Sequence, residues 1–473
     1  AVQALKRKNS LPGICGRVCP QEVQCESRCV LGKKGAPVAI GRLERYVADW
    51  DLSTKKCPVC ELLPPSGKRA AVVGSGPAGL TCAADLARMG HSVTIFEALH
   101  DGGGVLVYGI PEFRLPKNIV RSEIEYVQSL GAKLELDSVV GRQVQIKGLF
   151  EEGFDAVFLG IGAGAPRFLG VAGENLNGVY SANEYLTRVN LMKAYRFPEY
   201  DTPIKKGKRV AVVGGGNVAM DAARSAVRLG AEEVHVIYRR TEEDMPAHKE
   251  EIHAAHAEGV QFHFLVNPVS VLGDGQVTGV CLRPQRLAEF DEGGRRRPKA
   301  IEGADFDLAL DMLVPAIGQT TDFDWMPADD SSVQTNWNSV LKTDDAFQTT
   351  RPGVFACGDA VSGPATVVGA VAQGNQVAQV VDHWLQTGQA VRPIIQAKRH
   401  DFAQTVNLDD YTDAERPLIP LIPVARRLQG DAFQEVETGF DLATAQAEAA
   451  RCLRCDLEWL QRMKLPVPKR EFA

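Results

Sequence analysis

The chain has 473 residues, and at roughly 100–200 residues per domain this length allows about three domains. Apolar residues make up 45% and charged residues 24%, an ordinary globular composition that excludes a disordered or fibrous protein. The net charge of −6 offers no basic surplus to nucleic acid or a membrane surface, and no apolar run reaches the roughly 20 residues that span a bilayer. We also find no signal peptide at the start, and therefore expect a cytoplasmic protein, with no nucleic-acid or membrane partner, whose clustered cysteines bind metal.

The first 66 residues are rich in cysteine, and apolar spacing over 38–50 predicts a helix there. Four of these cysteines follow one another closely in the pattern C-x3-C-x5-C-x3-C: Cys15, Cys19, Cys25 and Cys29. Thiolates are soft ligands that suit iron–sulfur clusters or zinc. The pattern therefore favours a metal centre of one of these kinds over four inert buried thiols.

A glycine-rich turn follows a short apolar strand over 68–73 and opens a helix that runs to about residue 90. In this turn Gly74 permits the tight bend, Gly76 lets the backbone approach a pyrophosphate, and Gly79 lets the helix pack on the strand. The next strand, over 92–96, ends at Glu97, which can accept hydrogen bonds from ribose hydroxyls. This unit predicts a dinucleotide site suited to FAD or NAD.

The same pattern occurs again, with strands over 208–213 and 233–238. Its turn contains Gly214, Gly216, Asn217, Val218 and, in place of the third glycine, Ala219. The acid is missing here, and the second strand is followed by two arginines, Arg239 and Arg240. A guanidinium pairs with a 2′-phosphate, whereas a carboxylate would repel it, so this turn favours NADP(H). The alternative is that both arginines are merely solvated.

A third strand runs into Gly358 and Asp359, and a helix over 370–385 follows. An aspartate at such a strand end can bond a ribityl hydroxyl, and the helix near Gln373 can direct its positive N-terminus toward a flavin. Coming after two nucleotide turns, this pair favours FAD in the first turn.

Residues 68–385 resemble the FAD/NAD(P) reductases of the glutathione-reductase type, with crossover segments at 159–163 and 314–318. The fold class implied is α/β, with two Rossmann-like nucleotide-binding domains, the NADP domain being inserted in the FAD domain, and an N-terminal helical iron–sulfur domain. The expected domains are an iron–sulfur domain over 1–66 and an FAD domain in two parts, 67–168 and 303–400. The NAD(P)H domain, 169–302, lies between these parts, and a C-terminal tail covers 401–473.

More narrowly, Cys19-Pro20, the segment Gly102–Lys117 and Tyr238-Arg239-Arg240 resemble the glutamate synthase small (beta) subunit family. That family includes the large subunit of NADH-dependent ferredoxin:NADP oxidoreductase and sulfide dehydrogenase. The resemblance adds Pro77, Ala78 and Gly104 to the expected FAD-binding residues.

The resemblance also implies two [4Fe-4S] clusters in the N-terminal domain. It makes Cys19, Cys25 and Cys29 ligands of one cluster and Glu44 a ligand of the other. The fourth ligand of the first cluster and three cysteines of the second would precede Ala1. We expect either that the domain is truncated or that Cys15, which lies outside the family's usual ligand set, completes a single cluster.

Two CxxC pairs remain, Cys57 with Cys60 and Cys452 with Cys455. Together they supply four ligands, enough for one tetrahedral site, so we expect an additional iron–sulfur or zinc site that joins the tail to the N-terminal domain. The alternatives are unrelated surface thiols or a redox pair.

These features predict an NADPH-dependent iron–sulfur flavoprotein subunit that exchanges electrons between NADP(H), FAD and [4Fe-4S] clusters. The cofactors carry the chemistry, so no catalytic acid or base is expected. A partner is required: glutamate synthase large subunit, another flavoprotein or a ferredoxin, in a hetero-oligomer. The alternatives are an electron-bifurcating ferredoxin:NADP oxidoreductase subunit, a sulfide dehydrogenase, or a non-catalytic scaffold that keeps the fold.

Overall fold

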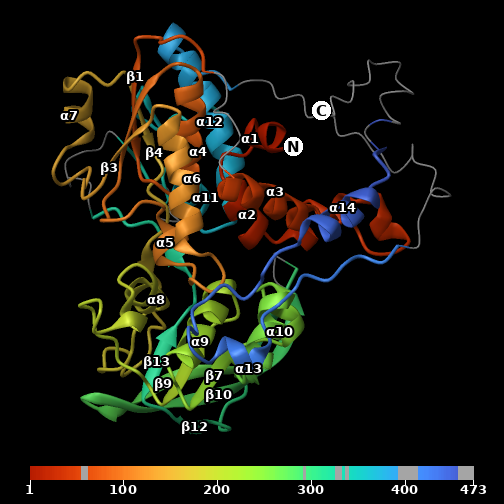
Figure 1. The fold of residues 1–473 in the computed structure, drawn as a ribbon. Helices are drawn as coiled ribbons and strands as arrows, with labels where there is room; N and C mark the ends of the chain where they lie inside the picture. The colour runs from red at the N-terminus through yellow and green to blue at the C-terminus, as the bar shows by residue number, and fades with distance from the viewer. Residues whose placement is uncertain are drawn as a thin grey trace. The chain divides into compact units, whose positions relative to one another are not determined.

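The structure is a computed structural model that describes residues 1–54, 62–290, 294–324, 333–335, 340–392, 414–455 and 457. The chain forms two compact units, one containing the N-terminal residues and most of the C-terminal segment, the other containing the residues between them together with 422–436. Figure 1 shows the chain coloured from the N- to the C-terminus.

The first unit is helical, as the sequence predicts. Its elements are α1 (Val2–Lys6), α2 (Pro12–Val18), η1 (Gln21–Val23), η2 (Glu26–Arg28), η3 (Val30–Lys33), α3 (Ile40–Thr54) and α14 (Leu442–Ala450). The distant segment that contains α14 is held to α3 by ion pairs, because Glu437 lies within bonding distance of both Arg42 and Arg45. The backbone N–H of Ala39 also donates to the Glu448 carboxylate at 2.6 Å.

The second unit contains two parallel sheets. The first has the strand order β15-β4-β1-β2-β3, and its strands are β1 (Arg69–Val73), β2 (Ser92–Phe96), β3 (Lys133–Glu135), β4 (Ala156–Leu159) and β15 (Val354–Ala356). Each of β1, β4 and β15 is an apolar run that is almost entirely buried. Its helices are α4 (Pro77–Arg88), α5 (Val105–Tyr108), α6 (Lys117–Ser129), α7 (Ile146–Glu151), α11 (Asp359–Ser362) and α12 (Val367–Thr387).

The second parallel sheet is formed by residues inserted between β4 and β15. It has the order β13-β6-β7-β8, with β6 (Arg209–Val213), β7 (Glu233–Tyr238), β8 (Gln261–Phe264) and β13 (Met312–Pro315). Its helices are α8 (Ala182–Asn190), α9 (Asn217–Arg228) and α10 (Lys249–Ala257), with the short turns η4 (Ala194–Arg196) and η5 (Glu242–Asp244).

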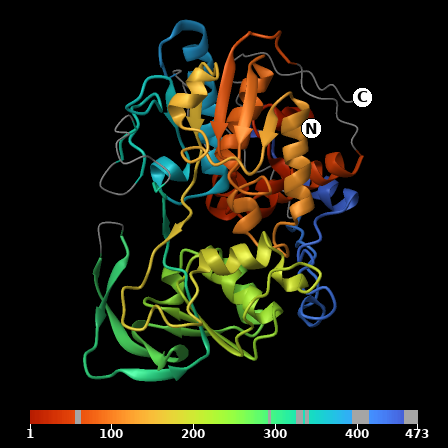
Figure 2. The ribbon, with the colours of Figure 1, turned by 90° about the vertical axis from the view of Figure 1, so that its left-hand side faces the viewer.

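An antiparallel sheet completes the inserted region. It consists of β9 (Val266–Asp274), β10 (Gln276–Phe290), β11 (Arg296–Ala300) and β12 (Phe306–Ala309), and Figure 2 shows the long β10 beside its partners. The two crossover segments meet as a short antiparallel pair, β5 (Ala165–Pro166) with β14 (Gln319–Thr320).

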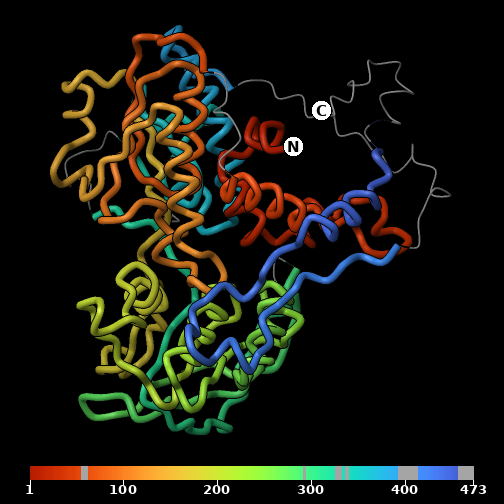
Figure 3. Tube along the Cα trace, in the orientation of Figure 1, coloured from red at the N-terminus to blue at the C-terminus, as the bar shows by residue number. Residues whose placement is uncertain are grey.

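Residues 422–436 return from the C-terminal part of the chain to the second unit and include the short helix α13 (Val424–Arg427), as the trace in Figure 3 shows. Phe433 stacks on Tyr195 with ring centroids 4.1 Å apart. The expected tail over 401–473 thus contributes to both units. Across the residues that the structure describes, none of the helices is sufficiently long and apolar to cross a membrane.

Candidate functional site

The first glycine turn joins β1 to α4 and leaves one side of its backbone open. Gly74 has φ +97°, and a Cβ there would lie 2.5 Å from the carbonyl oxygen of Gly160; a Cβ on Gly79 would lie 1.9 Å from the carbonyl oxygen of Gly74. A Cβ on Gly76 would meet nothing within 4 Å. The turn is therefore closed where it packs and open at Gly76, as a pyrophosphate at the helix N-terminus requires.

Glu97 lies just beyond β2, as expected, and its side chain is buried. It accepts hydrogen bonds from the Ser75 N–H at 2.9 Å, the Ser75 hydroxyl at 2.5 Å and the Leu99 N–H at 3.0 Å. These bonds fix the carboxylate against the glycine turn. Pro77 and Ala78 begin α4 and are buried.

Gly104 lies beside the same turn, since a Cβ on it would be 3.2 Å from the Gly76 Cα. Its backbone, with φ +55° and ψ −130°, is in a region that only glycine reaches easily. The preceding residue, Gly103, donates its N–H to the Ser75 hydroxyl at 2.8 Å. The structure thus brings Gly104 together with the first turn, although α4 and β2 lie between them in the chain.

Gly358 and Asp359 follow β15, at the same edge of the sheet. The N–H of Gly358 donates to the side-chain oxygen of Gln373 at 2.7 Å, and Asp359 accepts from the Ala365 N–H at 3.1 Å. Burial raises the pKa of Asp359, although the Ala365 bond opposes this. Helix α12 starts at Val367 rather than near 370, and the Thr366 hydroxyl caps it. Gln373 therefore lies inside the helix, and its side chain bonds the backbone at the end of β15.

The second turn has the same construction. A Cβ on Gly214, which has φ +147°, would lie 2.4 Å from the carbonyl oxygen of Ala316, whereas a Cβ on Gly216 would meet nothing within 4 Å. Asn217 begins α9, and its side-chain oxygen accepts from the His248 N–H at 3.0 Å. Val218 is exposed at the start of the helix, and the neighbouring Ala219 is buried.

The two arginines after β7 have different surroundings. Arg239 is exposed, whereas Arg240 is buried and donates its Nε–H to the backbone carbonyl of Arg296 at 2.7 Å. The sequence treated the two as equivalent. In the structure Arg239 is the one with an exposed side chain, and Arg240 joins the strand end to β11.

The residues of both turns therefore fit dinucleotides. In each, the middle glycine faces open space at a helix N-terminus, and a Cβ on the first glycine, Gly74 or Gly214, would collide with a backbone carbonyl oxygen. An exposed cation follows the second turn and a fixed carboxylate follows the first, which is the difference expected between NADP(H) and FAD sites.

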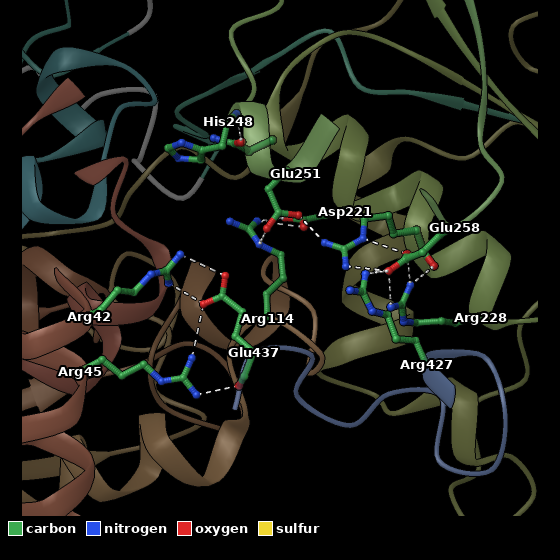
Figure 4. A network of polar contacts seen from close by, with 12 residues as sticks. Arg42, Arg45, Arg114, Asp221, Arg228, His248, Glu251, Glu258, Arg427 and Glu437 are labelled. Atoms are coloured by element: carbon green, nitrogen blue, oxygen red, sulfur yellow. Dashed lines mark hydrogen bonds and ion pairs between the residues drawn. The ribbon is translucent and has the colours of Figure 1, made fainter. Parts of the chain in front are cut away.

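A buried ionic network was missed by the sequence analysis, because its members are far apart in the chain. Figure 4 shows it in the second unit, where Arg114 bonds Asp221 and Glu251. Glu258 accepts from the three arginines Arg224, Arg228 and Arg427. A hint was available: α9 presents Asp221, Arg224 and Arg228 at helical spacing among small apolar residues.

In the first unit, Cys15 and Cys19 lie one turn apart at α2. Cys15 is buried, and a hydrogen bond with Cys19, together with burial, raises the pKa of Cys15. Cys25 is exposed, and Cys29 accepts from the Val38 N–H at 3.4 Å. Glu44, in α3, accepts from the Asn9 side chain at 2.8 Å, and burial raises the pKa of Glu44 to about 7.

These thiols have the chemistry of iron–sulfur ligands, but the structure does not gather them. Within the described parts of the chain, no three His, Cys, Asp or Glu side chains lie close enough together to hold a metal ion. The assignment of Cys15, Cys19, Cys25, Cys29 and Glu44 as ligands therefore stays a prediction.

The second expected metal site is described only in part. Cys57 and Cys60 lie outside the described residues. Cys452 is exposed just after α14, and Cys455 is partly buried. That the two CxxC pairs form one shared metal site stays a prediction.

The chain matches two family descriptions. Residues 68–374 match pyridine nucleotide-disulphide oxidoreductase, and residues 1–56 match dihydropyrimidine dehydrogenase domain II, 4Fe-4S cluster. The chain therefore belongs to the pyridine nucleotide-disulphide oxidoreductase family and begins with a 4Fe-4S domain. These matches confirm the predicted enzyme class and the predicted cofactors FAD, NADP(H) and [4Fe-4S].

Curated relatives extend this similarity over most of the chain. The beta subunit of NADP(+)-dependent formate dehydrogenase from Moorella thermoacetica is 40% identical over 95% of this chain and 66% of its own length. The small chain of glutamate synthase [NADPH] from Escherichia coli (strain K12) is 37% identical over 82% of this chain and 83% of its own. The beta subunit of NADPH-Fe(3+) oxidoreductase from Geobacter sulfurreducens is 36% identical over 94% and 69%. These relatives confirm the resemblance to the glutamate synthase small-subunit family.

A solved structure supports the fold. FprA from Mycobacterium tuberculosis in complex with NADPH aligns with a TM-score of 0.57 and 21% identity, over 69% of this chain and 86% of FprA. The predicted fold class, with two nucleotide-binding domains and an N-terminal iron–sulfur domain, is confirmed.

Proposed function

We propose that this chain is an electron-transfer subunit that oxidises NADPH at the second glycine turn, with FAD held at the first, and exchanges electrons with a partner subunit through iron–sulfur centres. When bound, NADPH supplies a hydride, FAD accepts it, and the clusters carry single electrons. The observation that carries the proposal is the pair of glycine turns, each open only at its middle glycine, Gly76 or Gly216.

The residues of the chain bind and orient the cofactors. The N–H groups at the start of α4 and α9 would bind the two pyrophosphates, and Arg239 would pair with the 2′-phosphate of NADPH. Glu97 is held by Ser75 so that it accepts from an adenosine ribose, and Asp359 accepts from the ribityl chain of FAD. No side chain has to move a proton for hydride transfer, because the cofactors carry the chemistry.

The relatives support a partner. Each of the three compared is one subunit of a larger enzyme by its own name, and their reactions differ: formate oxidation, glutamate synthesis and Fe(3+) reduction. We therefore propose a hetero-oligomer in which the partner subunit accepts or donates the electrons, and in which this chain supplies the NADP(H)-linked half.

An anaerobic visible spectrum of the purified protein tests the function. We expect flavin peaks with a broad iron–sulfur shoulder, both bleached by NADPH. A colourless protein would support a non-catalytic scaffold instead. Bleaching by NADH alone would overturn the NADP(H) assignment. In a separate experiment, co-purification of a second protein with this chain would identify the partner subunit.

A further inference from the structure

One continuous segment, Gly104 to Lys117, contacts both nucleotide-binding regions of the second unit. At its start, Gly104 lies against the first glycine turn, and Gly103 before it donates to Ser75. Near its middle, the backbone carbonyls of Tyr108 and Gly109 accept from the Asn190 side chain in α8, at 3.2 and 3.3 Å. The segment therefore starts at the FAD turn and reaches into the inserted region.

The C-terminal part of the segment is bonded to α9 through the Arg114 side chain. Its Nη1 donates to both carboxylate oxygens of Asp221, at 2.9 and 2.8 Å, and its Nε lies 3.0 Å from Glu251 in α10. The side chains of Arg114 and Asp221 are only 9% and 5% exposed. Asp221 lies one turn after Asn217, so this bond holds the helix whose N-terminus forms the second glycine turn.

The preceding residue, Phe113, is fixed from two sides. The guanidinium carbon of Arg228 lies 3.8 Å from the centre of its ring, and the Val436 N–H donates to its backbone carbonyl at 3.0 Å. Arg228 is itself bonded to the buried Glu258. The residue next to Arg114 is thus held by contacts on its ring and on its backbone, and Figure 4 shows the Arg114 side chain directed at Asp221 and Glu251.

We propose that Arg114 is a positioning residue for hydride transfer: through Asp221 it fixes the NADP-binding helix α9 relative to the FAD turn. The inference rests on the proposed function. Two charge-assisted bonds from one planar guanidinium nitrogen and a third from Nε define an orientation as well as a distance. Hydride transfer depends steeply on both, because a displacement of about 1 Å can cost roughly 100-fold in rate.

The test compares Arg114→Gln with a control, Arg121→Gln, in the full chain loaded with flavin. Arg121 lies on α6, has a side chain 47% exposed and pairs with Asp101. Stopped-flow reduction of the flavin at saturating NADPH measures the limiting rate, and calorimetry with 2′,5′-ADP measures affinity for the NADP site alone. For R114Q we expect the limiting rate to fall roughly 10- to 100-fold while the affinity for 2′,5′-ADP changes less than about threefold. For R121Q we expect both to stay at the wild-type value.

Loss of Arg114 alone leaves the Asp221 charge buried, and this can unfold the protein. The double variant Arg114→Met with Asp221→Leu removes both charges and keeps similar volume, so it supplies the measurement if R114Q loses its flavin. An unchanged limiting rate in either folded variant overturns the inference. So does a fall in 2′,5′-ADP affinity that matches the fall in rate, because Arg114 would then maintain the site itself. If NADPH fails to reduce the wild-type flavin, the proposed function fails instead.

Discussion

Glu258 and Arg228 form a bidentate ion pair in which both side chains are completely buried, with N–O distances of 2.6 and 3.0 Å. Arg224 and Arg427 donate to the same carboxylate, so one negative charge is shared by three guanidinium groups. Arg427 comes from the segment 422–436, which returns to the second unit far along the chain. Glu258 is therefore the point at which that segment is held by charge.

Removing this charge should destabilise the second unit. Glu258→Gln leaves three arginines around a neutral amide, and breaking a buried pair in this way costs about 3–5 kcal/mol. We expect a clear fall in the urea midpoint of unfolding, measured by circular dichroism. Glu242→Gln is the matched control, because the Glu242 side chain is 41% exposed and, among the bonds described, pairs with the exposed His256. Equal midpoints for E258Q and E242Q would show that the network adds nothing to stability.

The same carboxylate should make stability depend on acid pH. Burial alone would raise the pKa of Glu258, but the hydrogen bonds and charges of Arg228 and Arg224 lower it to about 2. Because the folded pKa lies below the unfolded value, the stabilisation is complete above about pH 4.5 and is lost as the pH falls toward 2. It amounts to about 3 kcal/mol at neutral pH. Between pH 6 and 3, the free energy of unfolding should fall more steeply for the wild type than for E258Q. Parallel curves for the two proteins would contradict the lowered pKa of Glu258.

The glycine turns predict a contrast between two alanine variants. Gly76→Ala adds a methyl group to open space, so the apoprotein should fold normally and lose roughly 10- to 100-fold in FAD affinity. Gly74→Ala forces a side chain into a positive φ and against the Gly160 carbonyl, so it should lower the melting temperature of the apoprotein itself. Flavin titration and thermal unfolding of both apoproteins check this. Tight FAD binding by G76A would place the pyrophosphate elsewhere.

Substitution of the two arginines after β7 should have different effects on nucleotide affinity. Arg239→Ala removes the exposed guanidinium, and we expect NADPH affinity to fall roughly 10- to 100-fold with little change for NADH. Arg240→Ala removes the bond to the Arg296 carbonyl and should weaken both nucleotides alike, by displacing the strand end. Steady-state KM values for NADPH and NADH measure this. An equal loss of both nucleotides in R239A would show that Arg239 does not contact the phosphate.

The iron–sulfur assignment can be tested without disturbing the flavin. Cys25 is exposed, so Cys25→Ser should leave the fold intact while lowering the iron content of anaerobically prepared protein. Cys281→Ser, in β10, is the control and should keep both iron and flavin. The ratio of iron to flavin in the two variants gives the answer. A wild-type ratio in C25S would remove Cys25 from the ligand set, and the same measurement on Cys15→Ala would settle its role.

The local architecture was predictable because it depends on neighbours in the chain. Apolar runs located β1, β2, β6 and β7 within one residue, and glycine patterns marked the turns after β1 and β6, since a buried parallel strand and a tight turn each need particular residues at adjacent positions. The resemblance to reductases of the glutathione-reductase type implied that one nucleotide region is inserted in the other, and the second parallel sheet does lie between β4 and β15 in the chain. The family matches then confirmed the class of oxidoreductase and its cofactors.

Other features depend on residues that only folding brings together. Nothing near Arg114 in the chain indicates Asp221, more than a hundred positions later, and nothing near Glu258 indicates Arg427. The different surroundings of Arg239 and Arg240 arise because β11 covers one of two identical side chains. The sequence by itself determined the two glycine turns, because a backbone preference is a local property. Only the tertiary structure decided which charges are buried together, because the burial of a charge depends on every element packed around it.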